Sequence, residues 1–246
     1  MPKDASWPSL RTAGFDGFLV SFARSLSEPA NRAALAFRAA VEQAGWAGVH
    51  ETSTSLVSTY LRFDPLWETH DEMRARLAKL IDTRDWFDAP LPEGRRLWRI
   101  PTVYGTDLAP QLGEAAKMAG LSEAAAIASL SETRVRVQTI GFAPGQPYLG
   151  ELPADWDIPR QSELTARVPV GALTVAIRQI VLFSVTAPTG WRHVGQTAIR
   201  LFQPEAEHPF VLRPGDEVIF PATTPEALSN MRDAGPMGGA EAEALK

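Results

Sequence analysis

Apolar and polar positions along the first third of the chain alternate in a way that predicts a strand followed by an amphipathic helix. Residues 17–22 form an apolar run, and Ser27 then offers a helix N-cap with Pro29 in the first turn. The apolar positions that share one face of this helix are Ala34, Phe37, Val41 and Ala44. Gly45 supplies the signal that ends it.

A second strand and helix pattern completes the first domain. Residues 50–63 are rich in Thr, Val, Leu and Tyr and predict one strand and most of a second. Thr69 and Glu72 match the Ser/Thr-x-x-Glu capping box at the start of a helix. With a last strand near residues 98–103, the order β-α-β-β-α predicts a ferredoxin-like split βαβ domain over residues 1–90.

The middle of the chain changes character twice. Residues 85–96 combine charged residues with proline and glycine and predict a linker. Two helices are expected next, the first with Leu108 and Leu112 on one face and the second capped by Ser122. Over residues 135–220, short β-type runs separated by Gly and Pro turns predict a closed antiparallel barrel.

The pattern as a whole predicts an α+β chain with two domains and a tail. The domains are expected over residues 1–90 and 97–222. Residues 223–246 are poor in large apolar side chains and contain a Gly-Pro-Met-Gly-Gly run, so we expect a flexible tail there.

Composition narrows the classes of partner. The 246 residues carry a formal net charge of −5, which argues against nucleic acid or an anionic membrane surface. The chain has no cysteine, which excludes disulfides, thiol nucleophiles and thiolate metal sites. The first five residues are polar and no apolar run is long enough for a membrane span. We therefore expect a cytoplasmic protein with a small-molecule or protein partner.

Several catalytic signatures are absent from the sequence. It contains no Gly-x-x-x-x-Gly-Lys-Ser/Thr loop, no Gly-x-Ser-x-Gly elbow and no His-Glu-x-x-His pair. The four histidines, His50, His70, His193 and His208, are scattered, so no metal site is expected. His193 differs from the others because it falls in a segment expected to be a loop, where it either contacts a substrate or partner or is structural.

Two segments hold more turn-forming residues than plain connections need. Residues 141–150 read Gly-Phe-Ala-Pro-Gly-Gln-Pro-Tyr-Leu-Gly, in which Gly and Pro fix the path while Phe142 and Tyr148 project aromatic surface. Residues 188–197 read Pro-Thr-Gly-Trp-Arg-His-Val-Gly-Gln-Thr. Trp191 is either a wall that stacks on a ligand or a plug of the barrel, and the same alternatives hold for the other two aromatic residues.

Polar candidates lie in and between these segments. Gly195 and Thr197 offer close backbone approach and a hydroxyl to a bound anion. Arg160 and Arg167 are candidates for holding a carboxylate or phosphate, because a guanidinium can donate two parallel hydrogen bonds to a planar oxyanion. The alternative for each arginine is a surface ion pair.

The two segments, together with Pro159-Arg160 and residues 167–171, resemble the bacterial family called allophanate hydrolase subunit 1 over residues 100–220. That family includes the B subunit of the ATP-dependent 5-oxoprolinase and a kinase-inhibitor protein of spore-forming bacteria. The resemblance implies that the C-terminal barrel is cyclophilin-like.

Asp107 stands where this family usually shows a glutamate, at the end of a Tyr-Gly-Thr-Asp run. The resemblance leaves two roles open. The carboxylate either acts on a proton or orients a substrate amide, or it caps the helix that carries Leu108 and Leu112.

The resemblance implies the smaller subunit of an ATP-dependent amidohydrolase complex of two or three proteins, acting on 5-oxoproline, allophanate or another urea derivative. The implied main partner is a large subunit that is similar either to allophanate hydrolase subunit 2 or to the C subunit of 5-oxoprolinase. In 5-oxoprolinase a third subunit is implied as well. This chain is expected to bind no cofactor itself, while the complex uses ATP. The alternative is a regulatory protein that inhibits a sensor histidine kinase.

Site residues follow from the motifs and the resemblance together. The expected catalytic residues are Asp107, Arg160 and His193. The residues expected to bind substrate are Phe142, Pro144, Gly145, Tyr148, Arg167, Gln179, Gly190, Trp191, Gly195 and Thr197. Three glycines of a family run are Thr174, Ile177 and Val181 here, which fills room that a ligand would use. The fold is expected to survive these changes, and the substrate stays open.

Overall fold

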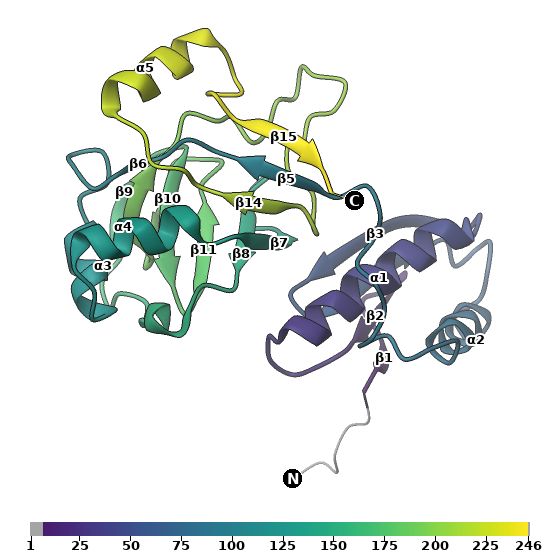
Figure 1. Cartoon of the computed structure of the whole chain (residues 1–246). Helices are drawn as coiled ribbons and strands as arrows, with labels where there is room; N and C mark the ends of the chain where they lie inside the picture. The colour runs from purple at the N-terminus through teal and green to yellow at the C-terminus, as the bar shows by residue number, and fades with distance from the viewer. Residues whose placement is uncertain (1–6, 246) are drawn as a thin grey trace. The chain divides into compact units, whose positions relative to one another are not determined.

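The computed structural model describes residues 7–245 (Figure 1). Residues 1–6 and 246, at the ends of the expected first domain and of the expected tail, lie outside the described residues. The chain divides after Glu93 into two units with separate cores. The division falls inside the segment that the sequence predicts as a linker.

The first unit is built on an antiparallel sheet with the strand order β1-β2-β4-β3. Its strands are β1 (Ser9–Thr12), β2 (Gly17–Ser21), β3 (Val49–Ser55) and β4 (Ser58–Phe63). The edge strand next to β2 is therefore β1. The expected last strand near residues 98–103 is wrong for this unit, because Arg96–Arg99 pairs within the other sheet.

Both helices of the first unit begin where the sequence predicts, and the first also ends at its predicted residue. Helix α1 (Glu28–Ala44) lies along the sheet in Figure 1, with Ser27 as its N-cap and Gly45 in the left-handed region at φ 57° as its C-cap. Helix α2 (His70–Ile81) starts with a complete capping box. The largest fully buried side chains in this core are Phe18, Phe22, Phe37, Phe63, Leu61, Met73 and Leu77.

The second unit contains a curled, half-barrel sheet of nine strands in the order β15-β5-β14-β7-β8-β11-β10-β13-β6. The strands are β5 (Arg96–Arg99), β6 (Val103–Tyr104), β7 (Val135–Ile140), β8 (Pro147–Gly150), β10 (Ala172–Ala176), β11 (Gln179–Leu182), β13 (Arg192–Gln196), β14 (Glu217–Ile219) and β15 (Glu241–Ala244). A separate ribbon consists of β9 (Thr165–Val168) and β12 (Ala187–Thr189). The predicted closed, purely antiparallel barrel is not what this pairing gives, since β14 and β5 are parallel and the sheet ends at β15 and β6.

The helices between β6 and β7 correct one expected role of Asp107. Helix α3 (Leu112–Met118) begins after Gln111, and helix α4 (Glu123–Glu132) begins after its predicted cap, Ser122. Asp107 lies in a turn before Pro110 and does not cap a helix. Proline disfavours helical torsions in the residue before it, so the helix cannot extend back to Asp107.

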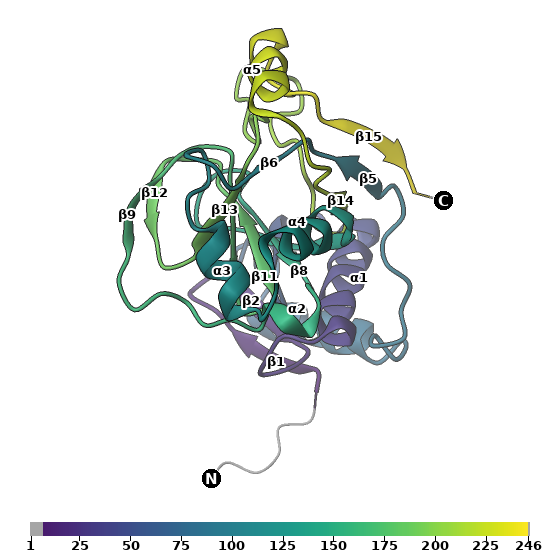
Figure 2. The same cartoon turned by 60° about the vertical axis from the view of Figure 1, so that its left-hand side comes forward.

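The segment expected to be a flexible tail is ordered over its described part, and that prediction is wrong. Helix α5 (Pro225–Ala234) is capped by Thr224, and β15 pairs antiparallel with β5, as Figure 2 shows. Met237 and Ala240 pack against the core of the second unit. Backbone pairing with β5 and the contacts of a few apolar side chains, including the buried Leu228, hold the segment in place.

Asp216 joins the two parallel strands of the second unit. Its carboxylate is almost fully buried and accepts hydrogen bonds from the Arg96 backbone at 3.0 Å, the Arg96 guanidinium at 2.5 Å and the Trp98 indole at 3.2 Å. The Arg213 backbone also donates to it, at 3.0 Å. The turn before β14 is thereby tied to the start of β5.

Within residues 7–245, no helix is long and apolar enough to cross a membrane. The same residues hold no group of three or more His, Asp or Glu side chains placed to bind a metal ion.

Candidate functional site

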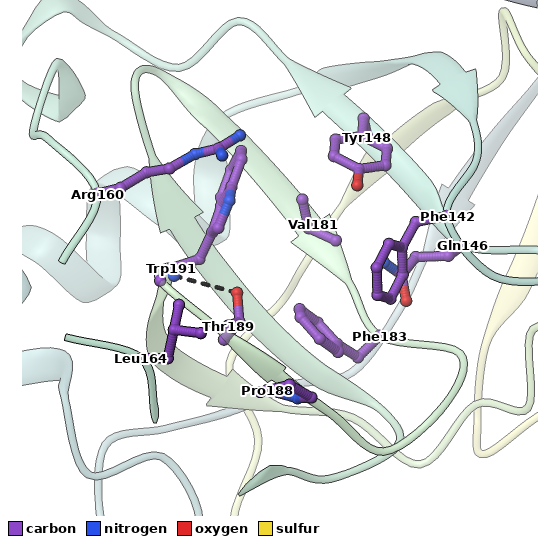
Figure 3. A pocket seen from close by; sticks show the side chains of 11 residues that line it. Phe142, Gln146, Tyr148, Arg160, Leu164, Val181, Phe183, Pro188, Thr189 and Trp191 are labelled. Atoms are coloured by element: carbon purple, nitrogen blue, oxygen red, sulfur yellow. Dashed lines mark hydrogen bonds between the residues drawn. The ribbon is translucent and has the colours of Figure 1, made fainter. Parts of the chain in front are cut away.

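A first cavity of the second unit, about 220 Å³ in volume, gathers much of both sequence motifs, and we call it the aromatic pocket. Figure 3 shows side chains from β8, β11 and the end of the β9–β12 ribbon converging on it. Its lining residues are Phe142, Gln146, Tyr148, Arg160, Leu164, Val181, Phe183, Pro188, Thr189, Gly190 and Trp191. Segments far apart in sequence thus form one wall because β8 and β11 are neighbours in the sheet.

Trp191 and Arg160 form the centre of the aromatic pocket. The Arg160 guanidinium carbon lies 5.2 Å from the centre of the Trp191 ring, and the Tyr148 ring meets that indole edge-on at 6.2 Å. The Trp191 backbone donates a hydrogen bond to the Thr189 hydroxyl at 3.1 Å. Trp191 is only 5% exposed and packs in a small buried cluster with Val168 and Phe183, so it is part of the scaffold as well as of the pocket wall.

The loop before β8 presents Phe142 at the pocket edge in a strained conformation. Phe142 has φ 71° and is 74% exposed, an arrangement that costs free energy and gains no burial. Gly145 has φ 71°, and a Cβ atom there would lie 2.9 Å from the Leu201 carbonyl oxygen, so the turn requires glycine. Gln146, which the sequence analysis did not single out, is buried in the lining and accepts from the Ser184 backbone at 3.4 Å.

A second cavity of about 690 Å³ gathers the other polar candidates, and we call it the arginine pocket. It contains Asp107, Arg167, His193 and Thr197 from the predicted set. It also contains Gln196, Arg200 and Arg232, which sequence reasoning missed. Arg232 belongs to α5, in the segment expected to be flexible, so no sequence signal placed it near a site.

His193 lies on a strand, which corrects the expected loop. In β13 it pairs with Thr174 of β10, and its backbone exchanges hydrogen bonds with Gln111 through the glutamine side chain at 2.9 Å and backbone at 3.0 Å. Gly190 and Trp191 form a bend before β13, whereas Gly195 pairs with Leu173 of β10 inside the sheet. The imidazole is 5% exposed, and burial lowers its pKa from the ordinary value despite opposing contributions from Gly195 and Gln196.

Two buried polar atoms of the arginine pocket have no hydrogen-bond partner among the described residues. They are His193 Nε2 and Gln196 Oε1. The Gln196 amide nitrogen already donates to the carbonyls of Val170 at 2.8 Å and Thr197 at 2.9 Å, which fixes the orientation of the amide. The Thr197 hydroxyl donates to the Gly171 carbonyl at 3.0 Å.

The predicted site residues therefore separate into three groups. Phe142, Tyr148, Arg160, Gly190 and Trp191 line the aromatic pocket, whereas Asp107, Arg167, His193 and Thr197 line the arginine pocket. Pro144, Gly145, Gln179 and Gly195 line neither.

The residues outside both pockets have structural contacts instead. Gln179 donates to Gln138 at 2.6 Å inside the sheet. A Cβ atom on Gly195 would meet the Thr102 side chain at 2.7 Å, so glycine allows β13 to approach its neighbour. Pro144 is exposed in the turn that Gly145 closes.

A comparison with protein families finds that the model described as carboxyltransferase domain, subdomain C and D, matches residues 8–212. The chain is 39% identical over 129 residues to the B subunit of 5-oxoprolinase from Escherichia coli O157:H7, which covers 52% of this chain and 59% of that protein. It is 27% identical over 221 residues to the B subunit of 5-oxoprolinase from Bacillus subtilis, covering 84% and 89%.

Solved structures show the same similarity. The crystal structure of a protein named TTHA0988 aligns with a TM-score of 0.73 at 32% identity, over 85% of this chain and 40% of that one. The urea amidolyase of K. lactis aligns over 100% of this chain and 17% of its own, with a TM-score of 0.73 and 15% identity, which is a likeness of fold. The chain thus spans less than two thirds of the E. coli relative and of TTHA0988.

Proposed function

Because the chain belongs to the family of carboxyltransferase domains, subdomains C and D, we propose that it is the smaller subunit of an ATP-dependent amidohydrolase complex. The relatives named as the B subunit of 5-oxoprolinase support this proposal. The proposed substrate is 5-oxoproline, opened to glutamate, ahead of allophanate or another urea derivative. The proposed partners are a large subunit similar to the C subunit of 5-oxoprolinase and a third subunit, all in the cytoplasm.

The stacked Arg160 and Trp191 in the aromatic pocket carry this proposal. 5-Oxoproline is a small, nearly flat lactam ring with one carboxylate. An arginine at the edge of an aromatic wall suits it, since the guanidinium donates two hydrogen bonds to the carboxylate while the indole covers the ring. Gln146, in the same lining, offers an amide that can pair with the lactam.

The positions of the expected catalytic residues indicate that this chain does not carry a complete catalytic site. Asp107 and His193 line a different cavity from Arg160, so the three expected catalytic residues do not form one constellation. We therefore propose that Arg160 holds the substrate and that this chain positions it and excludes water. Activation of the amide by ATP would then depend on groups of the partner subunits.

We also propose a fold type for each of the two units. We propose that the first unit is ferredoxin-like, with β1 taking the edge position that a strand after α2 would otherwise hold. We propose that the second unit is cyclophilin-like, which its curled sheet supports. The domain boundary would fall after Glu93.

A regulatory role is the second candidate. Phe142 is 74% exposed and Leu164 is 67% exposed, and both lie at the edge of the aromatic pocket. Exposed apolar side chains around a cavity are typical of a protein-binding surface. The occupant would then be a loop of a protein such as a sensor histidine kinase.

Reconstitution separates the two candidates. The tagged chain should be purified from its host, its partners identified, and ATP-dependent release of glutamate from 5-oxoproline measured with each partner present or absent. We expect turnover only when the partner subunits are added. Turnover by the single chain, or capture of a sensor kinase with no turnover in any combination, would contradict the proposal.

A further inference from the structure

The arginine pocket contains charged side chains that have no role in the proposed function. Arg167, Arg200 and Arg232 reach it from three separate elements, which are β9, the loop after β13 and α5. Arg200 has a long contact of 4.0 Å with Glu205. Among the described residues, the structure gives Arg167 and Arg232 no ion pair or side-chain hydrogen bond, so their donors are available to a ligand.

Two other side chains of this pocket offer hydrogen-bond acceptors. Asp107 contributes a carboxylate, and Gln196 contributes the oxygen Oε1, which is buried without a partner among residues 7–245. Rotation of the Gln196 amide would not help, because its nitrogen is held by two carbonyl groups. A buried acceptor without a donor is costly, and a ligand with an N–H or O–H group would satisfy it.

His193 adds a second unpaired group beside this acceptor. Its Nε2 atom is buried without a hydrogen-bond partner in the described part of the chain, and the neighbouring Gln196 side chain favours the protonated imidazole, against the larger opposing effect of burial. A neutral imidazole can donate or accept at this atom, depending on its tautomer. The pair can therefore receive a ligand group that both donates and accepts, such as a hydroxyl.

From the arginine donors and the buried acceptor beside them, we propose that the arginine pocket is a second ligand site, which takes a small oxyanion that carries its own hydrogen-bond donor. The arginines bind the oxyanion, and Gln196 Oε1 accepts from the donor. Phosphate that retains an O–H and a hydroxylated carboxylate share this chemistry. The inference is independent of the proposed function, because 5-oxoproline is assigned to the aromatic pocket.

Two matched pairs of anions test the donor requirement by calorimetry on the full chain at neutral pH. Hydrogen phosphate carries an O–H group and sulfate carries none, and lactate differs from propionate by one hydroxyl. We expect the donor-bearing member of at least one pair to bind about tenfold more tightly, as expected for satisfying a buried acceptor. The pair that shows this preference identifies phosphate or carboxylate as the ligand class.

Variants of the exposed arginines test the location without disturbing the core. The double variant R167Q/R232Q should weaken binding of the preferred anion by at least about tenfold, because charge-assisted hydrogen bonds to the anion are lost. The control R24Q/R213Q removes two exposed arginines outside both pockets and should leave binding unchanged. R160Q should also leave it unchanged, which separates this site from the aromatic pocket.

Three results would overturn the proposal. They are the absence of saturable binding for all four anions, equal affinities within both pairs, and affinities that R167Q/R232Q leaves unaltered. Absence of 5-oxoproline turnover by the parent chain in every combination of partner subunits, with anion binding intact, would instead count against the proposed function alone.

Discussion

Arg160 is the residue whose removal most directly tests the aromatic pocket. Arg160→Gln should weaken substrate handling by the assembled complex about tenfold to a hundredfold, as expected for the loss of a charge-assisted pair of about 1.5–3 kcal/mol. Stability should change by no more than about 1 kcal/mol, the size of an exposed cation–π contact. Steady-state kinetics and thermal unfolding measure the two effects, with R213Q as the control. Full activity would show that Arg160 does not hold the substrate, and an unfolded variant would show that its main role is structural.

Substitution of Trp191 tests stability, because its ring is both buried and part of the pocket wall. Trp191→Ala should lower the free energy of unfolding by about 3–5 kcal/mol, as other large-to-small changes in a core do. Trp191→Phe keeps an aromatic face and should cost clearly less. Denaturant unfolding of both variants gives the values, and a loss below about 1 kcal/mol for the alanine variant would show that the cluster does not depend on the indole.

His193 should make the protein less stable in mild acid. Burial lowers its pKa below the ordinary value of about 6.5, so the unfolded chain takes up a proton that the folded chain resists. The loss of free energy of unfolding that His193 causes is absent above about pH 6.5 and grows as the pH falls through that value. His193→Gln cannot titrate and should lose less stability than the parent between about pH 7.5 and pH 5.5. Equal shifts of the urea midpoint in the two proteins would contradict a lowered pKa.

At the scale of elements, Asp216 decides whether β5 and β14 stay joined. Asp216→Asn keeps the shape of the side chain but leaves the Arg96 guanidinium without its charged partner. Breaking such a buried pair costs about 3–5 kcal/mol. Chemical denaturation should show this loss, while Glu243→Gln, at an exposed ion pair of the same sheet, should change stability by less than about 1 kcal/mol. Similar stabilities of the two variants would show that the carboxylate does not hold the strands.

The elements also differ in how well sequence predicts them. Both helices of the first unit follow local signals, since Ser27 and the box formed by Thr69 and Glu72 act within one turn. β13 and β15 carry no comparable signal. They exist because β10 and β5 offer unpaired backbone edges, and such partners are distant in sequence.

At the scale of the whole molecule, the two units should survive separation. Trp86 and Ala89 belong to the core of the first unit, and the division follows at Glu93, which is exposed. Limited digestion with a glutamate-specific protease should therefore cut after Glu93 early, and both fragments should unfold cooperatively in separate denaturation experiments. Mass spectrometry identifies the cut. First cleavage within β10 or β11 would show that the second unit is not a stable core.

The sequence by itself determined the α+β class, the N-caps of α1, α2 and α4, the linker and the family, because these depend on short-range patterns and on motifs that lie together in the chain. It also identified nine of the residues that line the two pockets. Only the tertiary structure separated those residues, placing Arg160 with Trp191 and His193 with Gln196, and it alone brought Arg232 of α5 to the second cavity. The physical reason is that strand pairing and register decide which side chains share a cavity, and both depend on partners far away in the chain.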